Sequence, residues 1–107
     1  MKKLSFAFLL LLMLSLTACA SNKVKIQSSS MEPALKLGEV YEYEKVAIDE
    51  LKVGDIVYVK EHNICHRIIE IGSDDEGKFF ILKADNNVIA DDITFRYQDI
   101  TGRIKVN

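Results

Sequence analysis

The sequence is poor in several features on which whole classes of function depend. Basic residues do not dominate, since 14 Lys and Arg stand against 16 Asp and Glu and the net charge is −2. A nucleic-acid-binding domain needs a basic face, so the composition argues against a nucleic-acid partner. No internal repeat or low-complexity tract follows residue 20, and 107 residues allow a single small domain. The two cysteines, Cys19 and Cys65, allow one disulfide at most.

A strong helical period is also missing after residue 20, and short runs of strand composition recur instead. The expected strands cover residues 24–26, 40–46, 56–59, 64–71, 79–82 and 100–106. The single proline, Pro33, predicts a turn, residues 73–77 predict a hairpin turn, and residues 84–92 predict a polar, acidic loop. Strands about 10–15 residues apart with turn signals between them predict an all-β domain, a small barrel or sandwich.

The first 18 residues have the pattern of a targeting segment. Lys2 and Lys3 precede an apolar run over residues 4–16. A basic start followed by about 7–15 apolar residues is typical of a signal peptide, and a membrane span needs about 20. The run ends in Leu-Thr-Ala-Cys at residues 16–19, which resembles a bacterial lipobox. The resemblance implies that the Cys19 thiol is lipidated, and the alternative is an uncleaved signal anchor.

These features predict how the chain is divided and where it resides. Residues 1–18 are expected to be a lipoprotein signal peptide or an anchor, residues 19–27 a tether with the first strand, and residues 28–107 the main domain. The basic end of such a segment stays in the cytoplasm, so we expect a lipid-anchored domain on the extracytoplasmic face of the cell membrane. Lipidation of Cys19 would leave Cys65 as a lone, small apolar side chain; a disulfide between the two is the alternative.

Three segments of the mature chain carry the motifs that point to chemistry. They are SSSMEPAL at residues 28–35, GDIV at 54–57 followed by CHRII at 65–69, and ADNN at 84–87 with Asp91 downstream. In this order and spacing they resemble the type I signal peptidase family, over residues 23–106. Many bacterial members have a lysine where this chain has His66, so the chain is similar to the serine–histidine branch of endoplasmic-reticulum, archaeal and some Gram-positive members. The resemblance implies the β fold of the signal peptidase catalytic core for residues 28–107.

The resemblance also implies roles for individual residues. Ser30, directly before Met in the motif, is the expected nucleophile and His66 the expected base, with Asp85 and Asp91 as the acidic positions. A serine hydroxyl needs an adjacent base, and a histidine, with a reference pKa near 6.5, needs little tuning for that task. A carboxylate on the far ring nitrogen would fix the tautomer and stabilise the imidazolium. We expect Asp85 to be that carboxylate, and Asp91 to hold the loop.

The remaining expectations concern the oxyanion and the acidic loop. Hydrolysis requires hydrogen-bond donors for the oxyanion; the Ser30 backbone N–H is one, and by resemblance the Ser28 hydroxyl is the other. Ala84 stands where the family motif has glycine, and an alanine at positive φ would be strained. Taken without the family pattern, Asp85 and Asp91 could equally be solvated loop carboxylates or part of a calcium-like site. No metal or organic cofactor is implied.

The expected function is therefore removal of signal peptides from exported preproteins by a membrane-tethered serine endopeptidase. The substrate would lie extended along a strand edge, with small side chains at the first and third positions before the cut, as the resemblance implies. The expected partners are exported preproteins and the membrane. Two alternatives remain: a non-catalytic lipoprotein that binds peptides or a membrane partner on the same fold, and a peptidase dedicated to maturing one substrate. Replacing Ser30 with alanine separates binding from hydrolysis.

Overall fold

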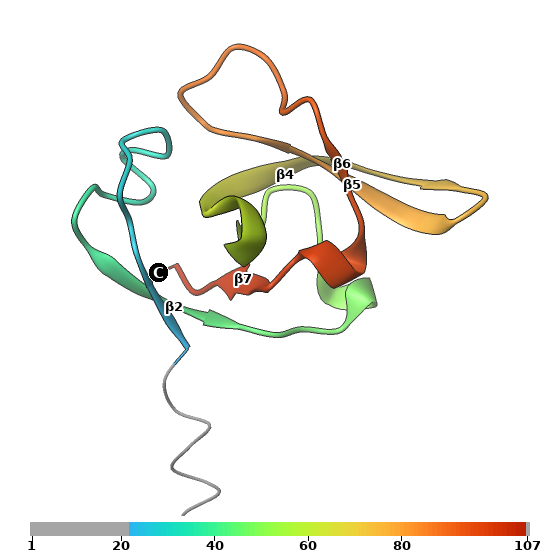
Figure 1. Cartoon of the computed structure of the whole chain (residues 1–107), viewed down its shortest axis with the longest axis horizontal. Coiled ribbons are helices and arrows are strands. Elements are labelled where there is room, and N and C mark those ends of the chain that lie inside the picture. The colour runs from blue at the N-terminus through green and yellow to red at the C-terminus, as the bar shows by residue number, and fades with distance from the viewer. Residues whose placement is uncertain (1–21, 107) are drawn as a thin grey trace, which may run out of the picture.

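Seven antiparallel strands form one curved sheet in the computed structural model, which describes residues 22–106 (Figure 1). The strands are β1 (Lys23–Lys25), β2 (Val40–Glu44), β3 (Ile56–Val59), β4 (Ile64–Asp74), β5 (Gly77–Lys83), β6 (Thr94–Phe95) and β7 (Gly102–Ile104). Their order across the sheet is β1-β2-β7-β3-β4-β5-β6. The helices of this part of the chain are three 3₁₀ turns, η1 (Ile48–Glu50), η2 (Lys60–His62) and η3 (Tyr97–Asp99). The predicted all-β class is confirmed.

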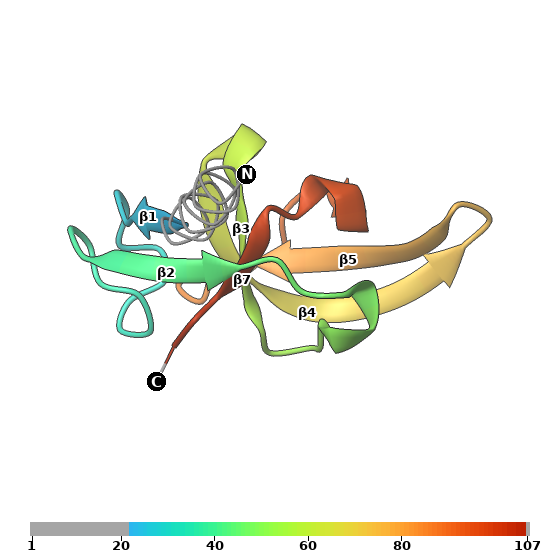
Figure 2. The ribbon, with the colours of Figure 1, turned by 90° about the horizontal axis from the view of Figure 1, so that it is seen from below.

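Every strand predicted from the sequence is present, with small shifts at the ends. β3 has the predicted bounds. β4 is longer than predicted: it continues to Asp74, which pairs with Gly77 at the start of β5, so that the β4–β5 hairpin projects from the rest of the domain (Figure 2). The sequence did not predict β6 or the 3₁₀ turns. A two-residue strand has no period to detect; β6 forms because Phe95, which is buried, comes to lie opposite Phe80 of β5.

Alternate side chains of the sheet are buried in two separate apolar cores. Core 1 contains Val46, Leu51, Val57, Val59, Ile68, Phe80, Leu82, Phe95 and Ile100. Core 2 contains Ile26, Met31, Leu35, Ile56, Ala84 and Ile104. Because successive residues of a strand point to opposite faces, Val57 joins core 1 while its neighbour Ile56 joins core 2. The two faces of β3 and β4 thus belong to different cores, and this division decides where each polar side chain of β4 points.

Two strand edges are left open near the start of β4. Residues 64–67 of β4 pair with β3, but pairing with β5 begins only at Arg67, opposite Lys83. Within residues 22–106, no strand pairs with residues 64–66 on that second side. In the same described range β1 pairs only with β2, so its outer edge is open there as well. These two open edges frame the candidate site.

The predicted apolar segment at residues 4–16 and Cys19 lie outside the described residues. Among residues 22–106, no helix has the length and the apolar character to cross a membrane. The predicted domain boundaries and the lipid anchor therefore stay predictions.

Candidate active site

Ser30 lies in a tight turn between β1 and β2, and the buried side chain of the next residue, Met31, holds this turn in place. Met31 and Leu35 are buried in core 2, and the Leu35 N–H donates to the Met31 carbonyl at 3.0 Å. Pro33 stands inside the turn, as the sequence predicted, and follows a cis peptide bond. The apolar anchors leave Ser30 half-buried at the rim of the core. The motif around Ser30 is therefore explained locally: the methionine holds the backbone while the serine remains accessible.

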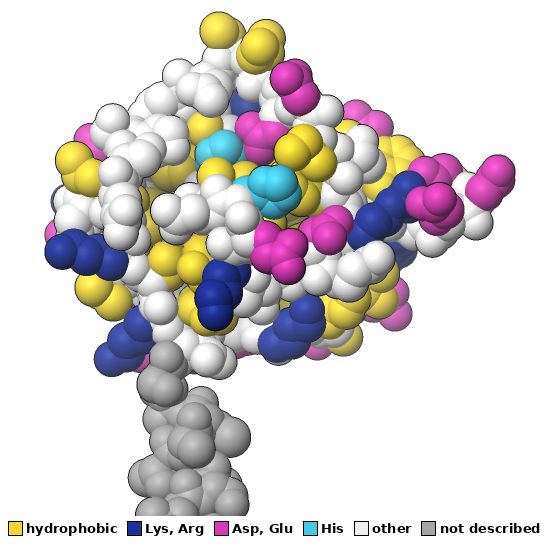
Figure 3. Space-filling view, viewed as in Figure 1, with side chains coloured by type: hydrophobic (Ala, Val, Ile, Leu, Met, Phe, Trp, Pro, Cys, Tyr) yellow, Lys and Arg dark blue, Asp and Glu magenta, His cyan; other side chains and the backbone are white. Residues whose placement is uncertain are grey.

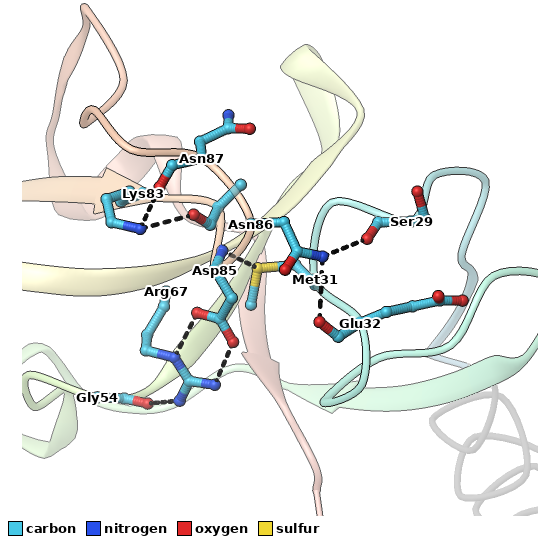
Figure 4. A network of polar contacts seen from close by, with 10 residues as sticks. Ser29, Met31, Glu32, Gly54, Arg67, Lys83, Asp85, Asn86 and Asn87 are labelled. Carbon is cyan, nitrogen blue, oxygen red and sulfur yellow. Dashed lines mark hydrogen bonds and ion pairs between the residues drawn. The ribbon is translucent and has the colours of Figure 1, made fainter.

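A second loop, residues 84–87, holds the Ser30 turn from the other side. The Asn86 backbone N–H donates to the Ser30 carbonyl at 2.9 Å, and the Asn86 side-chain amide donates to the carbonyls of Ser29 at 2.8 Å and Glu32 at 3.1 Å (Figure 4). Three hydrogen bonds from one residue restrain the backbone on both sides of Ser30. Sequence reasoning gave Asn86 no role, although its place beside Asp85 in the ADNN motif was a signal that could have found it.

Asp85 is hydrogen-bonded to Arg67 and not to His66, against the expectation that Asp85 orients His66. Its carboxylate accepts two hydrogen bonds from Arg67, from Nε and from Nη2, each at 2.8 Å (Figure 4). Arg67 also donates from Nη1 to the Gly54 carbonyl at 2.7 Å. The bond from Arg67 holds the pKa of Asp85 below its usual value, and the same pair raises the pKa of Arg67. Asp85 thus ties the loop that carries Asn86 to β4.

Asp91 occupies the position beside His66. Nδ1 of His66 and Oδ2 of Asp91 are 2.6 Å apart, with the two side chains 12% and 18% exposed. This distance is short for a hydrogen bond between nitrogen and oxygen. The Asp91 backbone N–H donates to the Leu82 carbonyl at 2.9 Å, which brings the end of the loop back against β5. Of the two acidic residues, it is Asp91 that reaches a ring nitrogen of His66, and the catalytic roles of both stay predictions.

The Ser30 turn and the start of β4 form the walls of one cleft of about 270 Å³. Residues 24–28 line one wall and residues 63–66 the other, and both Ser30 and His66 contribute to the lining. Met31, Leu35 and Tyr58 also line it, so the cleft is apolar in its depth. The predicted nucleophile and base therefore border the same cavity.

The two expected oxyanion donors lie next to each other in this cleft. The Ser30 backbone N–H donates to the Ser28 hydroxyl oxygen at 3.0 Å, and both residues line the cavity. Ala84 is fully buried in core 2, and the non-glycine residue with positive φ in the described range is Asn63, at 53°. The alanine that replaces the motif glycine is thus unstrained, and its Cβ adds to the core.

Cys65 is another ionisable group of the cleft. It carries a free thiol that is half-buried beside core 2. Burial raises the pKa of this thiol to about 11. The thiolate is the nucleophilic form of a cysteine, so Cys65 is poorly suited to catalysis at neutral pH. This environment agrees with the interpretation from the sequence that Cys65 is a small apolar side chain.

Comparison with known proteins places the chain in a family. The family profile described as signal peptidase, peptidase S26, matches residues 2–89. The chain belongs to this signal peptidase family. The signal peptidase complex catalytic subunits SEC11C of Homo sapiens, Mus musculus and Canis lupus familiaris are each 35% identical to it over 81 residues. No solved structure matches the chain significantly.

The similarity to these relatives covers most of this chain but only part of theirs. The matched region covers 71% of this chain and 42% of each SEC11C subunit, so the chain spans less than half the length of these relatives. A signal peptidase activity is the expectation at family level. Within this chain, the geometry groups Ser28, Ser30 and His66 around one cleft, sets Asp91 behind His66, and pairs Asp85 with Arg67.

Proposed function

We propose that this chain is a serine endopeptidase that removes signal peptides from exported preproteins, with Ser30 as nucleophile and His66 as base. The observation that carries the proposal is the position of His66. One side of its ring meets the Asp91 carboxylate at 2.6 Å, and His66 also lines the cleft that contains Ser30. Acyl transfer by a serine requires a base that a carboxylate holds on one ring nitrogen and whose other nitrogen is free for the serine hydroxyl.

The proton path follows from this arrangement. His66 donates its Nδ1–H to Asp91, so the lone pair of Nε2 is free to take the proton of the Ser30 hydroxyl. The Ser30 oxygen then attacks the scissile carbonyl carbon, and the imidazolium gives the proton to the leaving amine as the C–N bond breaks. Asp91 stabilises the imidazolium between these two steps. A water molecule that loses a proton to His66 then hydrolyses the acyl-enzyme, which releases the second product and restores the Ser30 hydroxyl. Asp85 acts through structure: it holds the loop from which Asn86 restrains the Ser30 turn.

The oxyanion would be bound by the Ser30 backbone N–H and the Ser28 hydroxyl. In the free chain the Ser30 N–H donates to the Ser28 hydroxyl oxygen, at 3.0 Å. Rotation of Ser28 about its Cα–Cβ bond would release the N–H and turn the hydroxyl toward the substrate. Such a rotation between staggered positions is ordinary for an exposed serine, and the oxyanion would replace the bond that is lost.

The backbone of β4 supports binding of an extended peptide on one wall of the cleft. Ile68 exchanges hydrogen bonds with the β3 side, since its N–H donates to Asp55 and its carbonyl accepts from Gly54, both at 2.8 Å. Residues of an antiparallel pair alternate in the direction of their backbone groups. His66 therefore also bonds toward β3, while the N–H and carbonyl of Cys65 point to the open edge.

The backbone of β1 supports the same peptide on the other wall. Ile26 exchanges hydrogen bonds with the β2 side, through Glu39 at 2.9 Å and Gly38 at 2.8 Å. By the same alternation, the backbone groups of Lys25 and Gln27 point away from β2, and both residues line the cleft. A substrate strand inserted between the two open edges would be bound mainly through its main chain.

The membrane tether belongs to the proposal as well. The lipobox-like residues 16–19 predict a lipid on Cys19, and an uncleaved anchor would serve the same purpose. From Cys19 to Ser30 the chain can extend at most about 36–40 Å. Either tether would hold the cleft close to the extracytoplasmic face of the membrane, where signal peptides of exported preproteins emerge.

A matched pair of alanine variants tests the proposal. The full chain is reconstituted in lipid vesicles with a preprotein that carries a signal peptide, and the released mature product is quantified. Ser30→Ala should lower the cleavage rate on the order of 10³-fold or more. Ser29→Ala should retain cleavage, because only its backbone carbonyl takes part in the contacts of the turn. Equal cleavage by both variants would contradict the proposal; binding of the preprotein without cleavage by the parent chain would favour the non-catalytic alternative.

A further inference from the structure

A second cleft, of about 400 Å³, lies beside the first. Its lining consists of His62, Ile64, His66, Ile89, Ala90, Asp91, Asp92, Ile93 and Phe95. Ile64 and His66 line both clefts. Figure 3 shows the two histidines of the chain at the surface, among hydrophobic and acidic side chains. The mechanism proposed above uses His66 and Asp91 but assigns nothing to the rest of this cleft.

The two clefts meet at the start of β4 but reach different cores. The first is lined by Met31 and Leu35 of core 2. The second is lined by Phe95 of core 1. The two faces of β4 meet at the open edge of residues 64–66, where no strand of the described chain pairs with β4 opposite β3. A peptide lying on this edge can therefore reach either face.

The walls of the first cleft define where a bound peptide must leave it. Both walls approach the reacting groups at the same end: residues 24–28 lead to Ser30, and residues 63–65 lead to His66. If the residues before the cut lie between these walls, the residues after the cut emerge beyond His66. There β5 begins to pair with β4 at Arg67, and the Arg67–Asp85 pair closes the gap between the strands.

One of the two faces is closed to the emerging peptide. On the core 2 side, the Ser30 turn is held against the loop of residues 84–87 by the three hydrogen bonds of Asn86. On the core 1 side, the second cleft begins at His66 itself. Among the described residues, the cleft that continues past His66 lies on the core 1 side.

We propose that the second cleft is the subsite for the residues that follow the scissile bond, and that it selects apolar side chains there. This inference rests on the proposed function, because it takes Ser30 and His66 as the reacting groups. Ile89 and Ile93 are 73% and 46% exposed, so both have apolar surface to bury against a substrate side chain. Asp91 and Asp92 in the same lining make the cleft unfavourable for an acidic residue.

Two neighbouring isoleucine and valine residues of one loop provide a matched test. Ile89 lines the cleft, whereas Val88 is 97% exposed and does not line it. Ile89→Ser and Val88→Ser remove similar apolar groups from the surface, and neither should unfold the chain. The probes are synthetic peptides with alanine at the first and third positions before the cut and with Leu-Leu, Ser-Ser or Asp-Asp directly after it.

Cleavage and binding are measured separately, on the full chain in detergent. The parent chain should cleave the Leu-Leu peptide roughly tenfold more efficiently, by kcat/KM, than the Ser-Ser peptide, as expected for apolar contacts in an open pocket. The Asp-Asp peptide should be the poorest substrate. Ile89→Ser should remove most of this preference, and Val88→Ser should keep it. The same order should hold for the affinity of fluorescent peptides for the Ser30→Ala variant.

The two readouts distinguish failure of the subsite from failure of the proposed function. Cleavage that depends on Ser30 but shows no preference after the cut, or a preference that Ile89→Ser leaves unchanged, would overturn the subsite alone. An equal loss of preference in Val88→Ser would assign the effect to the loop as a whole and would also overturn it. Selective binding to Ser30→Ala without hydrolysis by the parent chain would support the subsite and reject the peptidase.

Discussion

Replacing Asp85 with asparagine should destabilise the fold, because Asp85 is bonded to Arg67 and not to the base. The side-chain oxygen of the new asparagine could accept one of the two 2.8 Å hydrogen bonds from the guanidinium, but its amide nitrogen would face a second donor. The positive charge of Arg67, 32% exposed, would lose its counter-ion and keep one bond to the Gly54 carbonyl. The variant therefore tests whether this pair is structural.

The size of the effect follows from the two hydrogen bonds. Hydrogen bonds to charged groups contribute about 1.5–3 kcal/mol each. Asp85 is 26% exposed in its side chain, so solvent screens part of this contribution. One bond survives in the asparagine variant, so we expect a loss of about 1–2 kcal/mol in the free energy of unfolding. In a domain of this size, each kcal/mol lowers Tm by about 4–8 °C, which predicts a decrease of roughly 5–15 °C.

Thermal unfolding of the full chain, followed by near-ultraviolet circular dichroism of the tyrosines, measures this decrease. The Tyr43–Tyr58 ring pair, 5.0 Å between centroids, supplies a tertiary signal. Asp75→Asn is the matched control, since Asp75 is exposed at the tip of the β4–β5 hairpin. The control should change Tm by no more than about 2 °C, as expected for a surface substitution.

The pH dependence provides a second measure of the same pair. Arg67 lowers the pKa of Asp85 in the folded chain. The stabilisation by the carboxylate is therefore complete above the unfolded pKa of about 3.9 and is lost as the pH falls through the lower, folded value. The Tm difference between the parent chain and Asp85→Asn should close in acid. An Asp85→Asn variant with unchanged Tm but abolished cleavage would refute this reasoning and would return Asp85 to a role in catalysis.

The remaining predictions concern the other groups of the site. Asp91→Asn should lower cleavage on the order of 10³-fold or more, as expected when the base loses its orienting carboxylate, with Tm nearly unchanged; full activity would exclude it as the partner of the base. Asn86→Ala should lower kcat roughly 10- to 100-fold with little change in KM, because the Ser30 turn loses its restraint, whereas Asn87→Ala should be close to the parent chain. Because its pKa is about 11, Cys65 should react with iodoacetamide far more slowly at pH 7.5 than a free cysteine, and faster as the pH rises. Cys19→Ala should abolish incorporation of a labelled fatty acid; unchanged labelling would reject the lipoprotein prediction.

Most of the fold could be predicted because its signals are local. β3 has the bounds that the apolar run at residues 56–59 predicted, and the residues around Gly77 form the predicted hairpin. β6 was missed because it depends on a contact between distant residues, Phe95 against Phe80, and the 3₁₀ turns were missed because three residues are too few to show a helical period. The extension of β4 to Asp74 was missed because polar residues of a hairpin are held in the sheet by pairing with their partner strand.

For the candidate site, too, the sequence determined some features and left others open. The sequence by itself determined which residue types are present and their order: a serine before Met31, a histidine on an apolar strand, and two aspartates six residues apart in one loop. It also determined, through the alternation of β4, that neighbouring side chains of this strand face different cores. It did not determine which aspartate meets the histidine, because both have the same chemistry and lie in the same irregular loop.

Only the tertiary structure decided that choice. The loop leaves β5 on the core 2 side, where the buried Ala84 precedes Asp85 and the guanidinium of Arg67 is within reach. It then returns to the core 1 side, where the Asp91 N–H bonds to Leu82 and its carboxylate meets His66. His66 and Arg67 are consecutive in sequence but point to opposite faces of the sheet, so each selects the carboxylate that the loop brings to its own face. The path of an irregular loop depends on contacts made after the strands have assembled, and no local pattern encodes it.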